Sequence, residues 1–346
     1  MPVTMQDVAR AAGVSAKTVS NVLGDYPYVR EETRARVMAA VQSLGYQMNF
    51  AARNLRSGRS GLLMLALPEL SLPYFAELAD AVIDAARREG YTVLVERTDS
   101  TRAGELEVLS GGRLRMVDGL IFSPLALGPE DVDALRVDFP MVLLGERIFD
   151  GPVDHVTMAN VEGGALATRH LLSLGRRRIA VLGVHAGEAM GSGPLRLRGY
   201  GAALAEAGLE VEPELAVEAG YWHRATGAEA THRLLDSGVA FDGLFALNDT
   251  LGLGALYALQ RRGLRVPEDV AVIGFDDVDD GAFATPSLST IDPDRGQIAR
   301  TAVSLLLRRI AGDPSLDHRV ETAPQVRLVV RESTRGRPPA PTDLHR

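Results

Sequence analysis

The chain has 346 residues, a hydrophobic fraction of 46% and a formal net charge of −8 at neutral pH. This length suits two or three domains, and the sequence contains no run of about eighteen apolar residues that could span a membrane. It contains no cysteine, which excludes disulfides, thiolate nucleophiles and thiolate metal sites. Asp7 and Arg10 interrupt any signal-peptide core, so we expect a cytoplasmic protein without membrane association.

The charge is distributed unevenly along the chain. Residues 1–60 carry eight basic and four acidic side chains, a net charge of +4, which leaves −12 on the remainder. A basic first segment on an acidic body favours attraction of phosphates by that segment alone. Lys17 is the only lysine and lies in no Gly-Lys-Ser/Thr loop, so the P-loop of ATPases and kinases is absent.

The stretch Met5–Leu23 predicts a helix-turn-helix. Apolar residues recur at helical spacing on one side of each helix: Val8, Ala9, Ala12, Val19, Val22 and Leu23. Gly13 lies where the turn needs a positive φ, Thr4 and Asp7 are spaced as a capping box, and Ser15 can cap the second helix. The residues that then point outward form a recognition helix for a major groove: Ala16, Lys17, Ser20 and Asn21. A purely structural helical hairpin is the alternative.

The segments that follow complete a DNA-binding headpiece. Glu31–Leu44 has apolar residues at helical spacing and predicts a third helix, so we assign the headpiece to residues 1–48. Asn49–Arg56 is amphipathic but too short to be helical alone in water. With the Gly/Ser-rich stretch Ser57–Gly61 it predicts a linker over residues 49–60.

From Leu62 onward, apolar strands alternate with amphipathic helices, which predicts an α/β fold with parallel sheets. The expected strands are Leu62–Leu67, Thr92–Glu96, Gly119–Phe122, Met141–Leu144, Ile179–Val184, Gly243–Leu247 and Val270–Phe275. The expected helices are Phe75–Glu89, Glu162–Leu174, Arg198–Ala207, Ala225–Leu235, Leu251–Arg262 and Gln297–Ile310.

The series is too long for one sheet, so we expect two lobes within residues 61–333. The first lobe covers about 61–158 and 291–323, and the second about 159–290 and 324–333. Leu288–Pro293 is expected to cross back between the lobes, because a strand-like segment, Val326–Val330, follows near the end. The polar, Pro-rich tail 334–346 predicts disorder.

Motifs of enzymatic chemistry are missing. The seven histidines form no HExxH, and no Gly-x-Ser-x-Gly is present. Gly187–Gly193 is Gly-rich but lacks a clean Gly-x-Gly-x-x-Gly, which favours a mobile loop at a cleft over a phosphate loop. We therefore expect no catalytic residues, no metal and no cofactor.

Polar groups follow two expected strands, at the sheet edge where open α/β sheets bind ligands. These are Asn248 and Asp276; Arg196 lies before a helix, and Trp222 is the only tryptophan. Together they suit a polyhydroxylated ligand, because an indole stacks on the apolar face of a sugar while charged groups bind its hydroxyls. We interpret the neighbouring Asp249 and Asp277 as helix-cap or turn residues.

The sequence resembles the lactose-repressor (LacI/GalR) family of transcriptional regulators over essentially Thr4 to Thr334. The likeness rests on Met5–Ser20, Val29–Arg34, Leu44–Tyr46 with Ala51–Leu55, Leu174–Ala180, Arg196–Tyr200, Asn248-Asp249, Val266–Ala271 and Ile273–Asp277. It implies a helix-turn-helix headpiece and a two-lobed body of the type I periplasmic-binding-protein fold. It also implies a homodimer that binds a pseudo-palindromic operator and releases it when a small effector closes the lobes.

The resemblance implies a set of functional residues. Ala16, Lys17 and Asn21 occupy base-contacting positions, and Asn49–Arg56 matches a hinge helix that folds on DNA and inserts Leu55 into the minor groove. The whole expected DNA-contacting set is Thr4, Ser15, Ala16, Lys17, Thr18, Ser20, Asn21, Arg53, Leu55 and Arg56. The expected effector-contacting set is Phe75, Arg147, Arg196, Trp222, Asn248 and Asp276.

Two departures from the family pattern qualify these expectations. Ala16 has almost no hydrogen-bonding reach, so preference at its base is weak or depends on a methyl contact. The tail has no leucine heptads, which favours a dimer over a tetramer.

We expect a repressor of carbohydrate-utilisation genes. The alternatives are a purine- or nucleoside-responsive regulator, a solute-binding protein without DNA function, and a dinucleotide-dependent enzyme. The sequence does not indicate the operator, the target genes, or whether the effector induces or co-represses.

Overall fold

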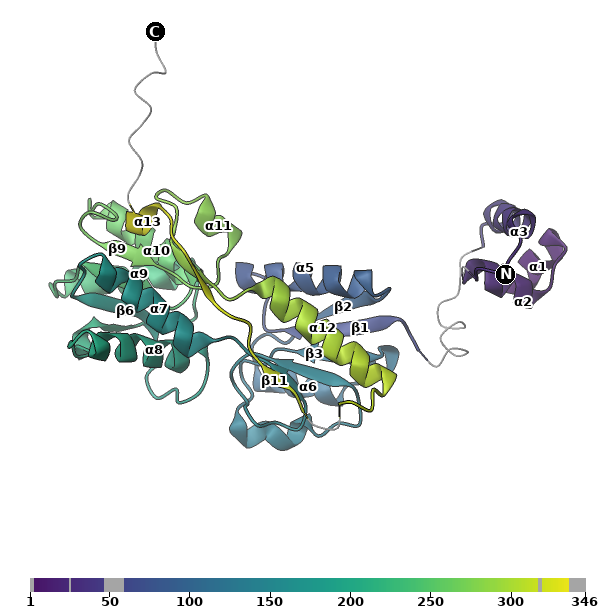
Figure 1. Ribbon diagram of the computed structural model, residues 1–346, viewed down its shortest axis with the longest axis horizontal. Coiled ribbons are helices and arrows are strands. Elements are labelled where there is room, and N and C mark those ends of the chain that lie inside the picture. The colour runs from purple at the N-terminus through teal and green to yellow at the C-terminus, as the bar shows by residue number, and fades with distance from the viewer. Residues whose placement is uncertain (1–2, 25, 47–58, 317–318, 336–346) are drawn as a thin grey trace, which may run out of the picture. The chain divides into compact units, whose positions relative to one another are not determined.

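The computed structural model describes residues 3–24, 26–46, 59–316 and 319–335. The chain divides into two compact units, Met1–Ser60 and Gly61–Arg346. Each unit buries its own hydrophobic core, and Figure 1 shows the helices and strands of both units.

The first unit contains the helices α1 (Met5–Ala12), α2 (Ala16–Leu23) and α3 (Glu31–Leu44). Thr4 and Asp7 form the expected capping box on α1, and Gly13 ends that helix at φ 64°. The Ser15 side chain caps α2 by accepting from the Thr18 amide at 3.1 Å. The three helices bury a small shared core of Val8, Ala9, Ala12, Val19, Val22, Val37 and Ala40.

The second unit consists of two α/β lobes (Figure 1). In lobe 1 a parallel sheet has the order β11-β5-β4-β3-β1-β2. Its strands are β1 (Leu62–Leu67), β2 (Thr92–Arg97), β3 (Gly119–Phe122), β4 (Met141–Leu144), β5 (Asp154–Val156) and β11 (Glu321–Thr322). One face is covered by the helices α5 (Pro73–Arg88) and α12 (Arg295–Ala311). The other is covered by α6 (Arg102–Ser110) and two 3-10 helices, Gly112–Met116 and Pro129–Leu135.

Lobe 2 repeats this plan with a four-stranded parallel sheet of order β7-β6-β8-β9. Its strands are β6 (Ile179–Val184), β7 (Ala216–Glu218), β8 (Gly243–Ala246) and β9 (Ala271–Ile273). One face carries α7 (Asn160–Ser173) and α8 (Ser192–Glu206), and the other carries α9 (Arg224–Asp236) and α10 (Asp249–Arg261). A 3-10 helix, Pro213–Leu215, precedes β7, and the short α11 (Asp279–Ala282) follows β9.

The chain passes between the lobes at three places (Figure 1). It leaves lobe 1 between β5 and α7, returns after β10 (Thr290–Asp292), and leaves again between β11 and β12 (Arg327–Val329). β10 and β12 pair antiparallel, so two crossing segments are hydrogen-bonded to each other. The expected crossing at Leu288–Pro293 therefore coincides with β10.

Two expectations about local structure are wrong. α8 begins at Ser192 and not at Arg198, because Pro194 lies in its first turn, where a missing amide hydrogen costs nothing. The expected disordered tail begins too early: α13 (Glu332–Arg335) is helical, and Thr334 is buried against His170 and Ser289. Residues 336–346 lie outside the described part of the chain.

Candidate functional site

The recognition helix α2 has a buried side and an outward side. Val19 and Val22 are buried against the other helices. On the outward side Lys17 is exposed, while Ala16, Ser20 and Asn21 are half-buried. Ala16 packs against the core of the headpiece, so hydrogen-bonding contacts to a base edge from this side fall to Lys17, Ser20 and Asn21.

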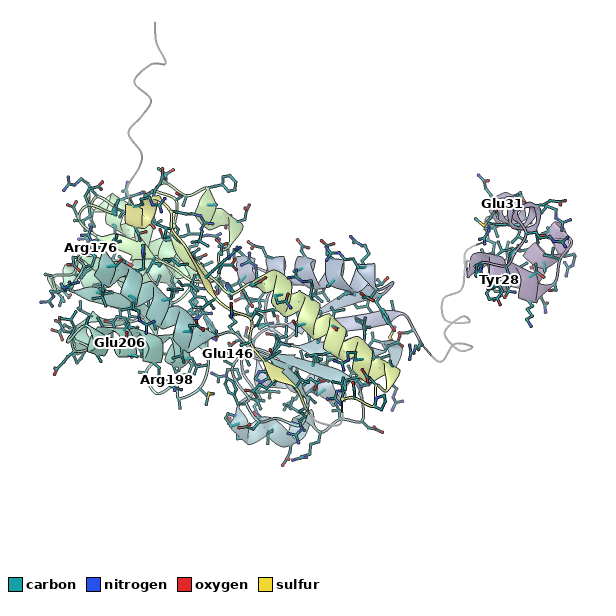
Figure 2. All side chains as sticks on the ribbon, in the orientation of Figure 1. Tyr28, Glu31, Glu146, Arg176, Arg198 and Glu206 are labelled. Atoms are coloured by element: carbon teal, nitrogen blue, oxygen red, sulfur yellow. The ribbon has the colours of Figure 1, made fainter. Side chains whose placement is uncertain are left out.

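The loop that follows α2 depends on a residue that sequence reasoning did not single out for contacts. Arg34 donates to the carbonyl oxygens of Val22 at 3.4 Å and Tyr26 at 3.2 Å, so it links α3 to the end of α2. In the same loop Tyr28 is 84% exposed at the headpiece surface (Figure 2). Arg53, Leu55 and Arg56, the expected hinge contacts, lie outside the described residues.

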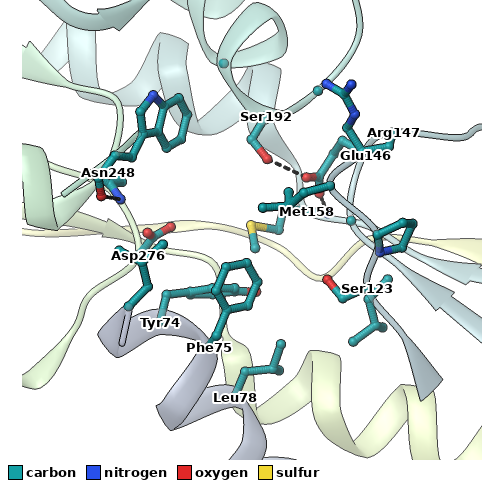
Figure 3. A pocket seen from close by; sticks show the side chains of 18 of the residues that line it. Tyr74, Phe75, Leu78, Ser123, Glu146, Arg147, Met158, Ser192, Asn248 and Asp276 are labelled. Atoms are coloured by element: carbon teal, nitrogen blue, oxygen red, sulfur yellow. Dashed lines mark hydrogen bonds between the residues drawn. The ribbon is translucent and has the colours of Figure 1, made fainter. Parts of the chain in front are cut away.

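The second unit contains a cavity of about 280 Å³ that residues of both lobes line. All six expected effector residues contribute to its lining, although they come from six different elements or loops. Phe75 is on α5 and Arg147 follows β4 in lobe 1, whereas the remainder belong to lobe 2: Arg196, Trp222, Asn248 and Asp276. Figure 3 shows that Asn248 and Asp276 lie across the cavity from Glu146 and Arg147.

Arg196 is the most heavily engaged side chain of the cavity. It is 2% exposed and donates to the Asn160 side chain at 2.7 Å, to the Leu247 carbonyl and to the Asp276 carboxylate at 3.3 Å. Its guanidinium lies over the Phe275 ring, 3.5 Å from the centroid. A buried charge needs such partners to offset its desolvation, so Arg196 serves the fold of lobe 2 as well as the cavity.

Asp276 presents a carboxyl group that loses its proton at a higher pH than an ordinary aspartate does. Burial raises the pKa of Asp276 to about 6, although the Arg196 and Arg295 guanidinium groups oppose that shift. Its backbone has φ 111°, a conformation that non-glycine residues rarely adopt. A strained, buried carboxylate on a cavity wall is typical of a binding site.

Asn248 and Trp222 are held by hydrogen bonds to the protein itself. The Asn248 side chain caps α10 by accepting from the Leu251 amide at 2.8 Å and donates to the Trp222 carbonyl at 3.3 Å. The Trp222 indole donates to the Gly183 carbonyl at 2.9 Å. With its N–H so engaged, the ring offers mainly its apolar face to the cavity.

The lobe 1 wall is mainly apolar. Its aliphatic and aromatic members include Leu72, Phe75, Leu78, Leu144, Val156 and Ile298. Tyr74 lies beside Phe75 (Figure 3), and burial raises the pKa of its hydroxyl. Sequence reasoning missed Glu146, which lines the cavity just after β4. The sequence contains a signal for Glu146, because it is a polar residue that follows a buried strand. The same criterion identified Asn248 and Asp276.

Asp249 and Asp277, interpreted from the sequence as structural residues, do not line the cavity. Asp249 is buried, accepts from the Thr290 hydroxyl at 2.7 Å and from the Val278 amide at 2.9 Å, and has a raised pKa because of that burial. Asp277 pairs with Arg331 at 2.6 Å. Among the described residues no cluster of three or more His, Asp or Glu could hold a metal ion, and no helix there could cross a membrane.

Comparison with known proteins identifies both units. Residues 4–49 match the bacterial regulatory proteins of the lacI family, and residues 168–334 match the periplasmic binding protein-like domain. The ribose operon repressor of Halalkalibacterium halodurans is 34% identical, covering 96% of this chain and 97% of that protein. The transcriptional repressor PurR of Pasteurella multocida is 32% identical, covering 96% and 99%.

Solved structures agree with these relatives. The lac repressor dimer bound to operator and the anti-inducer ONPF is 29% identical with a TM-score of 0.82, covering 96% of this chain and 99% of that one. The regulator CelR in complex with cellobiose is 31% identical with a TM-score of 0.70, covering 96% and 99%. By sequence, fold and domain order, the chain belongs to the lacI family of DNA-binding transcriptional regulators, which are not enzymes.

Proposed function

We propose that this regulator represses genes of carbohydrate use as a homodimer that leaves its pseudo-palindromic operator when a sugar binds in the cavity between the lobes. Residues 1–48 would contact the operator, 49–60 would form the hinge, and 61–335 would bind effector and dimerise. The single observation that carries the effector site is the convergence of Phe75, Arg147, Arg196, Trp222, Asn248 and Asp276 on one cavity.

The chemistry of the cavity favours a polyhydroxylated ligand. The Trp222 ring offers an apolar face, and the Asp276 carboxylate can accept hydrogen bonds from hydroxyl groups. The apolar wall around Phe75 and Leu78 suits the hydrocarbon face of such a molecule (Figure 3). The names of two relatives, one for a ribose operon and one solved with cellobiose, support the sugar class.

We expect ligand binding to act on DNA through a change in the relative position of the lobes. A ligand that contacts both walls stabilises one relative lobe position, and the three crossings allow the lobes to move as bodies about β10 and β12. Such coupling between two sites is typically about 1–3 kcal/mol. The expected outcome is a several-fold to hundredfold weaker operator complex in the presence of effector.

The experiment is a thermal-shift screen of the full chain against a panel of sugars and nucleosides. We expect a sugar to raise the midpoint of the second unit, and Asp276→Asn to abolish that rise, since it replaces the accepting carboxylate by an amide of equal size. The matched control is Asp236→Asn in an exposed pair with Arg262 on the same lobe. A nucleoside that shifts the midpoint while no sugar does would contradict the sugar class, and an unchanged shift in Asp276→Asn would contradict the site.

A further inference from the structure

The loop His185–Gly191 joins β6 to α8, lines the cavity and is tied to the opposite lobe. Arg147 of lobe 1 forms an ion pair with Glu188 and donates to the Met190 carbonyl at 2.8 Å. Just beyond the loop, the Ser192 hydroxyl donates to Glu146 of lobe 1 at 2.6 Å (Figure 3). Arg147 and Glu188 are each about one quarter exposed, so water screens their attraction less than at an open surface.

His185 extends this contact into the wall of lobe 2. Its Nδ1 lies 3.0 Å from the second Glu188 oxygen, and its Nε2 lies 2.9 Å from the Gly220 carbonyl and 3.0 Å from the Ala219 carbonyl. Both ring nitrogens thus face acceptors, which only the protonated imidazole can satisfy as a double donor. The His185 ring lies 5.9 Å from the Trp222 ring at an interplanar angle of 30°.

We propose that Arg147, Glu188 and His185 form a chain of ion pairs between the two lobes, which we call the latch. The latch holds the loop 185–191 over the cavity and positions the Trp222 ring. Glu188 is the centre of the latch, because its two oxygens serve cations from different lobes. The three act as positioning residues: they set how far the lobes close and how readily the loop admits a ligand. The regulatory meaning rests on the proposed effector site, but the contacts themselves do not.

The protonation equilibria agree with this geometry. The Glu188 hydrogen bond raises the pKa of His185 to about 9, so the imidazolium persists at neutral pH. Partial burial raises the pKa of Glu188, but the hydrogen bonds and charges of His185 and Arg147 outweigh it and lower that pKa overall. The other charged side chains on the cavity lining are Glu69, Glu146, Arg196 and Asp276.

Trp222 provides a direct test because it is the only tryptophan in the chain. A protonated imidazole beside an indole quenches its emission, so the fluorescence of the full chain should rise as His185 loses its proton. We expect a midpoint near pH 9 in the wild type. Glu188→Gln should lower it by roughly one pH unit or more, since one unit corresponds to about 1.4 kcal/mol of lost interaction with the charged form.

The matched control is Glu206→Gln at the end of α8 in the same lobe (Figure 2), which breaks an exposed pair with Arg169 of α7. It should leave the midpoint where the wild type has it. A midpoint in Glu188→Gln equal to that of the wild type would overturn the His185–Glu188 half of the latch.

The Arg147–Glu188 contact between the lobes is tested by a variant in lobe 1 whose effect is measured in lobe 2. Arg147→Gln should increase amide hydrogen exchange in the peptides that cover residues 185–191 by several-fold. Arg136→Gln, which breaks an exposed pair with Asp133 in lobe 1, should not. If the loop exchanges equally in both variants, the lobes are not latched through Arg147.

Neither measurement uses a ligand or DNA. Failure of both would therefore remove the latch and leave the proposed effector site standing. Failure of the thermal-shift screen would remove the proposed effector site and leave the latch standing.

Discussion

The two units of this regulator use their functional side chains in opposite ways. On α2 of the headpiece, Lys17 is exposed and the core is made by other residues, so the proposed base contact is separate from the folding of the headpiece. In the cavity, Arg196 and Asn248 hold the lobe together while they line the site. Substitutions on the outward side of α2 should therefore change sequence specificity without loss of stability. Substitutions that change the ligand of the cavity should also destabilise lobe 2.

The largest expected effect is that of Arg196→Ala on the second unit. Loss of the guanidinium leaves Asp276, Asn160 and the Leu247 carbonyl without their donor, and breaking a buried pair costs about 3–5 kcal/mol. Arg198→Ala, two residues along α8 and exposed (Figure 2), should stay within about 0.5 kcal/mol. Urea denaturation followed by Trp222 emission measures both, and equal stability of the two variants would show that Arg196 does not support the fold.

The pH dependence of stability gives the next largest effect. The pKa of Asp276 is about 6 in the folded chain and 3.8 in its ordinary state, so the folded chain binds more protons between these values. Stability should therefore fall as pH rises from about 4 to 6, by on the order of 2–3 kcal/mol. Asp276→Asn should lack this decrease in stability, and an equal change of the denaturation midpoint with pH in both proteins would contradict the raised pKa of the buried carboxyl.

Lys17→Ala should affect DNA binding alone. We expect a change in the preferred base at one operator position, worth about 1–3 kcal/mol, with unchanged unfolding. Arg59→Ala, outside α2, should weaken all sequences alike. Binding-site selection followed by gel shift distinguishes them, and a uniform loss in Lys17→Ala would mean that its contact is to phosphate.

The smallest expected effect concerns the capping box of α1. Thr4→Ala removes the hydroxyl that accepts from the Asp7 amide and donates to the Asp7 carboxylate. Loss of a cap costs about 1 kcal/mol, which should appear in the melting of the headpiece and leave that of the second unit unchanged. A lower midpoint of the second unit would show that the units do not unfold independently.

Most of this fold can be predicted from the sequence because the spacing of its apolar residues is regular. Strands such as Leu62–Leu67 and Ile179–Val184 agree to the residue, since each is an apolar run between turns. The start of α8 at Ser192 could not be predicted from the sequence. Gly193-Pro194 resembles a loop unless its position in the first turn of a helix is known. Nor could the sequence place Thr334, whose partners His170 and Ser289 are far away in the chain.

For the site, sequence and resemblance together named six residues that the fold brings to one cavity. They missed Glu188 and His185, whose proposed roles depend on the approach of Arg147 from the other lobe. A single carboxylate shared by two cations from separate segments has no local signature. Such contacts appear only in three dimensions.

The most direct test of the account is operator release by the sugar that gives the largest thermal shift. The measurement is a gel-shift titration of that sugar against the operator complex of the wild type and of Asp276→Asn. We predict that the wild type releases DNA while Asp276→Asn binds the operator equally well and stays bound at the same sugar concentration. Equal release of both proteins would contradict the claim that this cavity controls the headpiece.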